Sequence, residues 1–496
     1  MRIRREGESR RAAGSRGERM NAPKRRSGGV RGPALGGAGG GLGNLGKGGG
    51  VAGILIALVV AFLAMRGGGG TTSTTGDGDV VGQRTQLVDV DKTTRSTLSG
   101  AERDDLDRFL QATVDDLLVF WTDEYPDVYG ARFEPLSAIF PFDPTGNQQI
   151  SCGQPLDPRI LNSNAIYCPP EDYITWDDNF LIPNFYANFG KAAVGVVLAH
   201  EYGHAVQTRG GLDAAPIIRD LQADCFAGAW IRRAIDGSGQ VELGENDLEG
   251  AVSGFLLLRD PPGNPTDSQS AHGSAFDRVN AFQSGYTDGA ARCRDFATEG
   301  VEIVDIALEQ GDVGGGNLAF QDAVDAVVAD LDEFWQPFFA QAGLGSGISA
   351  RWFEGSAIPC PDSGSDGQVF HYCASDASVQ LNQATLARLH ADIGDFSTGL
   401  HLARLYGEAA ATEAGVADRT GLVADCLAGV WAGNVAYEST RALELTGGDL
   451  DEALATLIDD PERADAASLF DRVDAFKRGF FLEGGSGTAA SVEFCS

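Results

Sequence analysis

The sequence predicts a mainly α-helical fold of the α+β class, present twice in tandem behind a single transmembrane helix. Three observations predict it: long apolar runs at helical spacing with weak strand signals, an internal repeat, and an uncharged apolar segment near the N-terminus. The length of 496 residues points the same way, because it exceeds what one hydrophobic core holds and suggests two or three globular units.

The internal repeat divides the chain into two related halves. Residues 220–230 read DLQADCFAGAW, and residues 421–431 read GLVADCLAGVW. Residues 276–285 read FDRVNAFQSG, and residues 470–479 read FDRVDAFKRG. Aromatic segments and cysteines also recur in the same order, which chance does not explain. We therefore expect one domain to be present twice.

Charge is distributed unevenly along the chain. Residues 1–66 hold 13 Lys and Arg against 3 Asp and Glu, whereas the whole chain has a net charge of −32. The remainder is therefore strongly acidic, which argues against nucleic acid as a partner because phosphates would be repelled over most of its surface.

An apolar segment without charge, VAGILIALVVAFLAM at residues 51–65, is the predicted membrane anchor. As a helix it would span about 22 Å, and bilayer thinning covers the shortfall against the hydrocarbon core. A cleaved signal peptide and a buried helix are the alternatives, but the leader is long and glycine tracts frame the segment. Its arginine-rich side is expected in the cytoplasm, with residues 67–496 outside.

The predicted organisation has five parts. We expect a disordered basic and Gly-rich cytoplasmic tail, a transmembrane anchor, a flexible linker, a metallopeptidase-like first domain and a metal-free duplicate, over residues 1–50, 51–66, 67–100, 101–300 and 315–496.

The eight cysteines all lie beyond the predicted anchor, in a compartment that favours disulfides. Four cysteines in one half allow three pairings, and the shortest loop favours the first two as partners. Buried free thiols are the alternative. The expected disulfides are Cys152–Cys168 and Cys225–Cys293, with Cys360–Cys373 and Cys426–Cys495 as their duplicates.

Three segments near the repeated motifs predict helices. NFGKAAVGVVLAHEYGHAVQ, at residues 188–207, is a long proline-free run with the apolar positions of a buried helix. Residues 216–235 place Pro216 in a first turn, and residues 275–289 read as a helix that ends at glycine. The segment AIYCPPEDYITW, at residues 165–176, predicts one or two short strands.

The stretch AHEYGHAVQ carries the chemistry. His200 and His204 are one helical turn apart, so both imidazoles can reach one zinc ion. Glu201 lies about 100° round the helix, beside the metal, where a carboxylate can accept a proton from water. This H-E-x-x-H pattern is typical of zinc metallopeptidases, whereas two hydrogen-bonded core histidines are the alternative.

A catalytic zinc needs a third protein ligand and an open position. Asp213, Asp220 and Asp224 are the first acidic candidates after the histidines. In the second half Asp220 is replaced by Gly421, in step with the loss of both histidines, whereas Asp224 persists as Asp425. We therefore expect Asp220 to bind the metal and Asp224 to orient His200 through its other ring nitrogen.

His272 is the remaining catalytic candidate. Its counterpart in the second half is Ala466, so it is lost together with the metal residues. A surface histidine is the alternative, but that would not explain the joint loss. We predict that His272 binds the oxyanion of the tetrahedral intermediate or the substrate.

The second half predicts its own replacement for the metal site. His200, Glu201 and His204 correspond to Arg404, Leu405 and Glu408. An Asp425 without an imidazole donor would be a costly buried carboxylate, and arginine supplies both charge and N–H donors. We predict an Arg404–Asp425 salt bridge, the alternative being that Asp425 caps its own helix.

The segments AHEYGHAVQ, LQADCFAGAW and HGSAFDR, with their flanking cysteines, resemble the bacterial neutral zinc metallopeptidases over roughly residues 1–300. That family is membrane-anchored with an Arg- and Gly-rich N-terminus. The resemblance implies a zincin-like domain with His200 and His204 as zinc ligands and Glu201 as the base. The family usually has glutamate, in an E-L-Q-A-D motif, where this chain has Asp220.

The predicted function is therefore zinc-dependent hydrolysis of peptide bonds on the extracytoplasmic side of a membrane. Zn²⁺ is the expected cofactor, and a protein or peptide the expected substrate. The alternatives are a non-catalytic envelope binding protein derived from a peptidase, and a zinc hydrolase that acts on cell-wall amides.

Overall fold

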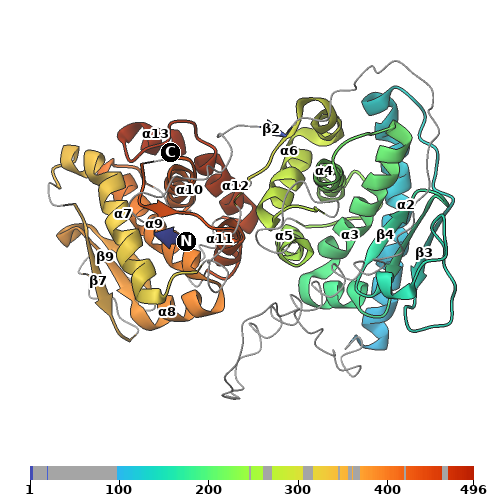
Figure 1. Cartoon of the computed structure of the whole chain (residues 1–496), viewed down its shortest axis with the longest axis horizontal. Helices are drawn as coiled ribbons and strands as arrows, with labels where there is room; N and C mark the ends of the chain where they lie inside the picture. The colour runs from blue at the N-terminus through green and yellow to red at the C-terminus, as the bar shows by residue number, and fades with distance from the viewer. Residues whose placement is uncertain are drawn as a thin grey trace, which may run out of the picture.

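The computed structural model describes most of the chain beyond residue 97 (Figure 1). The described residues are 1–3, 19–20, 98–244, 247–260, 271–304, 306, 317–344, 347–355, 360, 369–417, 421–438, 440–460 and 467–496. Below, the first half means the described residues of 98–304, and the second half those of 317–496. Both halves are mainly helical, as predicted.

The first half combines one small sheet with five helices. The long helix α2 (Gly100–Tyr129) comes first and is followed by strands β3 (Ala138–Phe142), β4 (Ala165–Cys168) and β5 (Tyr173–Asp177). In the sheet β5 is central, parallel to β3 and antiparallel to β4, so β4 is an edge strand. The remaining helices are α3 (Leu181–Gly210), α4 (Pro216–Ile235), α5 (Asp247–Leu258) and α6 (Ala275–Glu299).

The second half repeats this order. Its strands β7 (Ser349–Phe353), β8 (Phe370–Cys373) and β9 (Ser378–Asn382) form a sheet with the same connectivity and the same strand directions. Its helices are α7 (Phe320–Gln341), α8 (Gln383–Asp392), α9 (Asp395–Glu413), α10 (Leu422–Tyr437), α11 (Asp449–Ile458), α12 (Leu469–Phe480) and α13 (Ala489–Cys495). The shared topology supports the duplication predicted from the repeat.

The predicted local elements are found with one difference. Helices α3 and α4 cover the two expected segments, with Pro216 at the start of α4, and β4 and β5 fall in the expected strand segment. The helix from residue 275 was expected to end at Gly289, but α6 continues to Glu299. Gly289 adopts a left-handed φ of 79° and kinks the helix without ending it.

The repeated motifs bring two helices into direct backbone contact. A Cβ atom added to Gly228 of α4 would lie 2.0 Å from the carbonyl oxygen of Phe282 in α6. One added to Gly285 of α6 would lie 1.7 Å from the carbonyl oxygen of Cys225. Only glycine permits this approach. In the second half Gly429 and Gly479 make the same reciprocal contact between α10 and α12.

All four predicted disulfides are confirmed. Cys152–Cys168 and Cys360–Cys373 close short loops beside the two sheets. Cys225–Cys293 ties α4 to α6, and Cys426–Cys495 ties α10 to α13. The described part of the chain contains no free cysteine.

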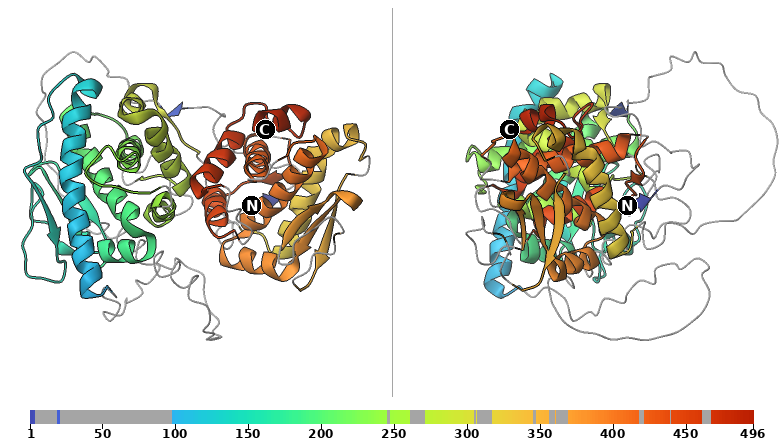
Figure 2. Two further views of the ribbon diagram at one scale, coloured as in Figure 1. Left: turned by 180° about the vertical axis from the view of Figure 1, so that it is seen from behind. Right: turned by 90° about the vertical axis from the view of Figure 1, so that its left-hand side faces the viewer.

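The two halves meet along helices α5 and α6 of the first and α11 and α12 of the second (Figures 1 and 2). Phe276 lies between the rings of the second half, 5.3 Å from Phe480 between ring centroids. The Asp451 carboxylate accepts a hydrogen bond from the Phe276 backbone N–H at 3.1 Å and lies 3.4 Å from the Arg259 guanidinium. The interface therefore combines packed rings with buried polar contacts, at Asp451 and between Gln283 and Lys477.

The first residues of the chain differ from the expected disordered tail. Strand β1 (Arg2–Ile3) pairs antiparallel with β10 (Leu443–Glu444) of the second half, and β2 (Arg19–Met20) pairs with β6 (Val301–Glu302). Backbone pairing gives these short pieces the order that their composition did not predict. In this arrangement residue 1 and the second half lie on the same side of any membrane, which differs from the predicted topology.

The predicted membrane anchor, residues 51–66, lies outside the described residues, as does the predicted linker up to residue 97. Within the described ranges, no helix has both the length and the apolar character needed to cross a bilayer.

The glycine contact between α4 and α6 gives a stability prediction. The substitution Gly285→Ala should lower the free energy of unfolding by about 2–3 kcal/mol, because the methyl group forces the two helices apart. Chemical denaturation of the full chain measures this. Gly254→Ala is the matched control, since its Cβ would meet Phe185 at an ordinary 3.4 Å and should cost nothing. Equal effects of the two substitutions would contradict the packing argument.

Candidate metal centre

Helix α3 carries the two histidines into the interior of the first half. The helix is broken at Gly190, whose φ is 78°, and its second part is an almost wholly buried run that includes His200 and Glu201. The Nε2 atoms of His200 and His204 lie 3.1 Å apart, as two residues one turn apart permit. The nearest Asp220 oxygen, from the first turns of α4, is 3.8 Å from His200 Nε2.

The hydrogen bond at the other ring nitrogen fixes the tautomer of His200. Its Nδ1 lies 2.7 Å from Asp224 Oδ1. The Asp224 carboxylate is fully buried and held at 2.8 and 2.9 Å by Arg278 Nε and Nη2, so it accepts rather than donates. His200 therefore carries its proton on Nδ1, and its Nε2 lone pair is left for another partner. This confirms the predicted contact between Asp224 and His200.

The tautomer of His204 is fixed in the same way by an amide. Its Nδ1 lies 2.9 Å from Gln207 Oε1, while Gln207 Nε2 donates to the carbonyl oxygen of Arg219 at 2.6 Å. Because the amide nitrogen is committed to a carbonyl, the oxygen must face the ring. The Nδ1 of His204 is thus the protonated nitrogen, and its Nε2 also presents a lone pair.

The Nε2 atoms of the two imidazoles therefore face each other at 3.1 Å with a carboxylate oxygen beside them, and in the neutral rings both present lone pairs. Lone pairs repel at this distance unless a metal ion or a proton lies between them. In a tetrahedral zinc site with Zn–N bonds of about 2.0–2.1 Å, two nitrogens lie roughly 3.3 Å apart, close to the spacing here. One ligand atom from each of His200, His204 and Asp220 lies within 4.8 Å of the other two. The donor set fits zinc.

Glu201 lies beside this cluster and next to the edge strand. Its carboxylate is buried and accepts a hydrogen bond from the backbone N–H of Tyr167 in β4. Burial raises the pKa of Glu201 to about 7, against the lowering effect of the neighbouring His200.

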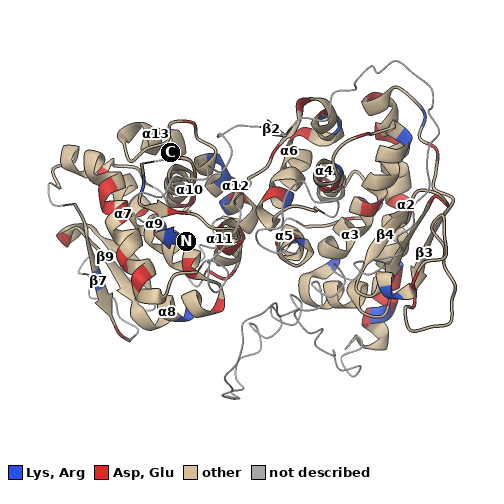
Figure 3. Ribbon diagram, in the orientation of Figure 1, with Lys and Arg blue, Asp and Glu red and all other residues tan. Residues whose placement is uncertain are grey.

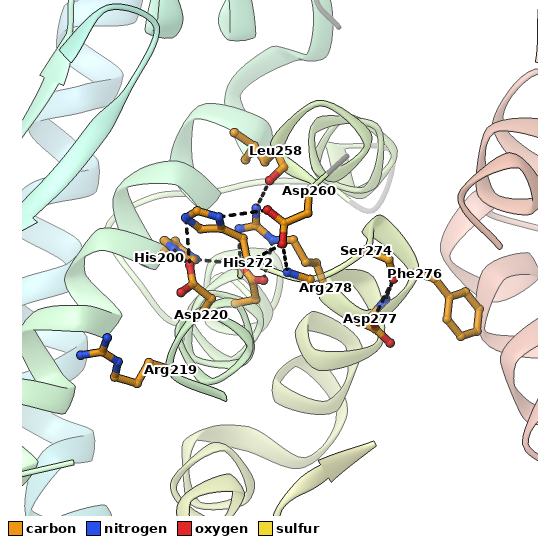
Figure 4. A network of polar contacts seen from close by, with 12 residues as sticks. His200, Arg219, Asp220, Leu258, Asp260, His272, Ser274, Phe276, Asp277 and Arg278 are labelled. Carbon is orange, nitrogen blue, oxygen red and sulfur yellow. Dashed lines mark hydrogen bonds and ion pairs between the residues drawn. The ribbon is translucent and has the colours of Figure 1, made fainter. Parts of the chain in front are cut away.

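His272 also reaches the cluster, from the loop before α6 (Figure 4). Its Nε2 lies 3.9 Å from Asp220 Oδ1, and its Nδ1 lies 3.2 Å from Asp260 Oδ1. Asp260 also accepts the backbone N–H groups of His272 and Gly273, at 2.6 and 2.9 Å. The His272 side chain is about one-third exposed, at 32%, so it marks the open side of the cluster.

Three residues that position the cluster were not predicted from the sequence: Gln207, Asp260 and Arg278. Arg278 stands in the repeated FDRV motif, so the repeat itself could have singled it out. Gln207 follows His204 by one turn, which is a weak signal. Asp260 lies 12 residues before His272 and gave no usable signal, because no helical or strand spacing relates residues so far apart in the sequence.

At the place where the first half has the metal cluster, the second half has charged side chains that pair with one another. Arg404 Nε lies 2.6 Å from Asp425 Oδ1, which confirms the predicted salt bridge in place of the His200–Asp224 contact. Arg404 Nη1 also lies 2.6 Å from Asp460, and Arg472 bridges the same two carboxylates at 2.9 and 2.8 Å. Two arginines and two aspartates thus form a buried quartet, and among the described residues no group of metal-ligating side chains is found at this place.

Comparison with known proteins agrees with this geometry. A family model described as "Putative neutral zinc metallopeptidase" matches residues 14–296. The chain belongs to this family. The match covers the whole metal cluster of the first half and ends before the duplicate.

Curated relatives are similar to part of the chain. The uncharacterized protein Rv2575 of Mycobacterium tuberculosis (strain ATCC 25618 / H37Rv) is 28% identical over 172 residues, which cover 29% of this chain and 57% of the relative. The uncharacterized protein YpfJ of Escherichia coli (strain K12) is 27% identical over 199 residues, covering 34% of this chain and 67% of the relative. The chain thus spans little more than half the length of the mycobacterial relative. No solved structure matches it significantly.

The buried quartet of the second half predicts a large loss of stability when one of its charged side chains is replaced. Arg404→Met should lower the free energy of unfolding by about 3–5 kcal/mol, because it breaks up a buried network of charges. Denaturation of the full chain measures it. Arg388→Met is the control: Arg388 is 54% exposed and paired within its own helix, so its loss should cost less than about 0.5 kcal/mol. A similarly small loss for Arg404→Met would contradict the account.

The two clusters together predict the metal content. We expect about one zinc per chain, measured by elemental analysis of the purified full chain, with binding abolished by His204→Ala. Glu408→Ala, at the corresponding position of the second half, should leave the zinc content unchanged. Two zinc ions per chain, or full occupancy after His204→Ala, would contradict this assignment.

Proposed function

We propose that the first half is a zinc-dependent peptidase that hydrolyses peptide bonds in protein or peptide substrates. The observation that carries this proposal is the pair of facing imidazole Nε2 atoms, with Asp220 beside them and Glu201 next to His200 on the helix. His200, His204 and Asp220 would hold the zinc. When bound, zinc supplies Lewis acidity, which polarises the scissile carbonyl and lowers the pKa of water.

The residues of the chain supply the rest of the chemistry. Glu201 accepts the proton of the attacking water and returns it to the leaving amine. Asp224 and Gln207 keep both ligand histidines in the Nδ1–H tautomer, so that their Nε2 atoms face the metal. His272, held by Asp260 on the exposed side, donates to the oxyanion of the tetrahedral intermediate.

The edge strand β4 supports an extended substrate. Among the described strands β4 pairs with β5 alone, so it keeps an outer edge; on that edge the backbone N–H groups of Ala165 and Tyr167 are already bound by the side chains of Asn164 and Glu201. Tyr167 of this strand contacts Glu201, which brings the edge to the base. A peptide paired along β4 would pass the metal cluster. The acidic side chains spread over both halves (Figure 3) make nucleic acid an unfavourable partner.

We also propose that residues 51–65 anchor the chain in a membrane, with both halves on the extracytoplasmic side. Four disulfides fit an oxidising compartment. The apolar, uncharged character of residues 51–65 fits a single span. In this topology residue 1 lies across the membrane from the second half, and the contacts of β1 with β10 would not form. Protease protection of sealed vesicles distinguishes the two arrangements.

The base assignment is tested by Glu201→Gln. This variant should retain zinc but lose activity against a peptide library by roughly 100- to 10,000-fold, because an amide cannot accept the proton. Zinc content and kcat are measured on the same sample. If the unsubstituted chain, fully loaded with zinc, cleaves no peptide, the non-catalytic binding protein replaces this proposal. Cleavage of cell-wall amides in place of peptides would favour the alternative of a zinc hydrolase that acts on cell-wall material.

The third ligand is tested by Asp220→Glu, which restores the residue that is usual in the family. It should bind zinc at least as tightly as the unsubstituted chain, because a glutamate carboxylate reaches one methylene further. Competition with a chelator measures the affinity, and Asp213→Glu serves as the control with no effect. A marked loss of zinc from the Asp220→Glu variant would mean that another residue supplies the third ligand.

A further inference from the structure

The second half holds a group of buried acidic side chains at a place unrelated to the zinc cluster. Asp395 begins α9, Asp449 and Glu452 lie in the first turn of α11, and Thr446 precedes that helix. These four residues are named here the ammonium site, because the ammonium group of Met1 lies among them. One ligand oxygen from each of the three carboxylates lies within 4.8 Å of the others.

The ammonium group of Met1 is bound by several acceptors at once. It donates to Asp395 Oδ1 and Oδ2 at 2.8 and 2.7 Å, to Asp449 Oδ1 at 3.1 Å and to Thr446 Oγ1 at 3.3 Å. Met1 and Asp395 are fully buried, and Asp449 is 1% exposed. A buried cation paired with two carboxylates and a hydroxyl meets the requirement that buried charges be paired and hydrogen-bonded.

The carboxylates are held in place for such a cation. Asp395 Oδ2 also accepts the backbone N–H of Leu318 at 2.7 Å, and Asp449 Oδ2 accepts that of Thr446 at 2.7 Å. Glu452 accepts the backbone N–H of Phe396 at 2.9 Å. Burial, followed by the charge of Asp449, raises the pKa of Asp395 to about 6. Such crowded buried acids are stabilised by a bound cation.

The site recognises more than a charge. The Met1 side chain is buried, and a Cβ added to Gly399 would lie 3.3 Å from both its Sδ and its Cε, so this glycine leaves room for the side chain. Arg2 forms an ion pair with Glu444, and the backbone pairs antiparallel with β10. Ile3 is 47% exposed, where the chain leaves the site. The site thus contacts the first and the second side chain of the bound segment, and the strand pairing fixes the direction of its backbone.

The first half lacks this site. By the register that matches His200 with Arg404, Lys191 stands in the place of Asp395, and its amine lies 3.0 Å from Asp105. The register of α5 with α11 places Gly250 where the second half has Glu452. In the same register Asp247 stands where the second half has Asp449, so two of the three acids belong only to the half that lost its metal ligands. The group is not a remnant of the zinc cluster.

We propose that the second half is a receptor for the free N-terminus of a peptide, recognised by its α-ammonium group, a first side chain of methionine size and a basic second residue. In the structure, residues 1–3 occupy the site with the ammonium group of Met1. In a chain anchored through residues 51–65, the N-terminus of another peptide takes their place. The receptor role requires neither zinc nor hydrolysis, so it goes beyond the proposed peptidase.

The test uses the full chain extended by a short sequence before Met1, so that its own ammonium cannot enter the site. A fluorescent peptide beginning MRIRRE is titrated with this protein, and anisotropy measures binding. We expect the free peptide to bind, and its N-acetylated form to bind at least about tenfold more weakly, because the ammonium charge and its donors are lost. A peptide that begins with glycine should also bind more weakly.

Variants assign the binding to the site. Asp395→Asn and Glu452→Gln should each weaken the peptide by about tenfold or more, with thermal melting to confirm folding. Asp325→Asn removes an exposed carboxylate of α7 and is the matched control. If the peptide binds more weakly to the unextended chain than to the extended one, the chain's own N-terminus occupies the site. If it binds equally to both, the site is open to other peptides. Either result supports the receptor.

Three results would overturn the proposal: no binding of the free peptide, equal binding of the acetylated peptide, or full binding to folded Asp395→Asn. Binding of calcium in place of the peptide would make the cluster a metal site only. Glu201→Gln and zinc removal should leave peptide binding unchanged, so failure of the peptidase proposal is distinguishable from failure of this one.

Discussion

In each half, the packing of three helices depends on one buried carboxylate. It lies on α4 in the first half and on α10 in the second. Asp224 joins three elements, because it accepts from His200 of α3 and Arg278 of α6 while standing on α4. Asp425 does the same between Arg404 and Arg472. A carboxylate at zero exposure cannot be left unpaired, so both of its partners are constrained together. In the first half this constraint also sets the protonation of a metal ligand.

The glycine contacts make that arrangement possible. Helices α4 and α6 approach until the Cα of one helix touches the backbone of the other, and α10 and α12 repeat the contact. This closeness brings Arg278 and Arg472 within reach of the aspartates, and Cys225–Cys293 ties α4 to α6 beside it. The same scaffold then supports a metal cluster in one half and a closed quartet of ions in the other. Fold and chemistry are separable here, because the same fold hosts two different sites.

Helix α11 connects the two specialised regions of the molecule. Asp449 and Glu452 face the Met1 ammonium, whereas Asp451 between them faces the first half and holds Arg259 and the backbone of Phe276. Arg259 is the neighbour of Asp260, which positions His272. Successive residues of one helical turn thus contact the ammonium site and the loops that flank the metal cluster.

The sequence by itself determined the features that depend on local spacing or on the repeat. The histidine pair follows from its position on one helix, the disulfides from the reduced number of pairings within each half, and the Arg404–Asp425 salt bridge from comparing the halves. Tertiary structure alone decided the roles of Gln207 and Asp260, and it alone placed Met1 against Asp395, 394 residues away. Such contacts depend on where loops and distant segments return to the core, and neither helical period nor composition encodes that return.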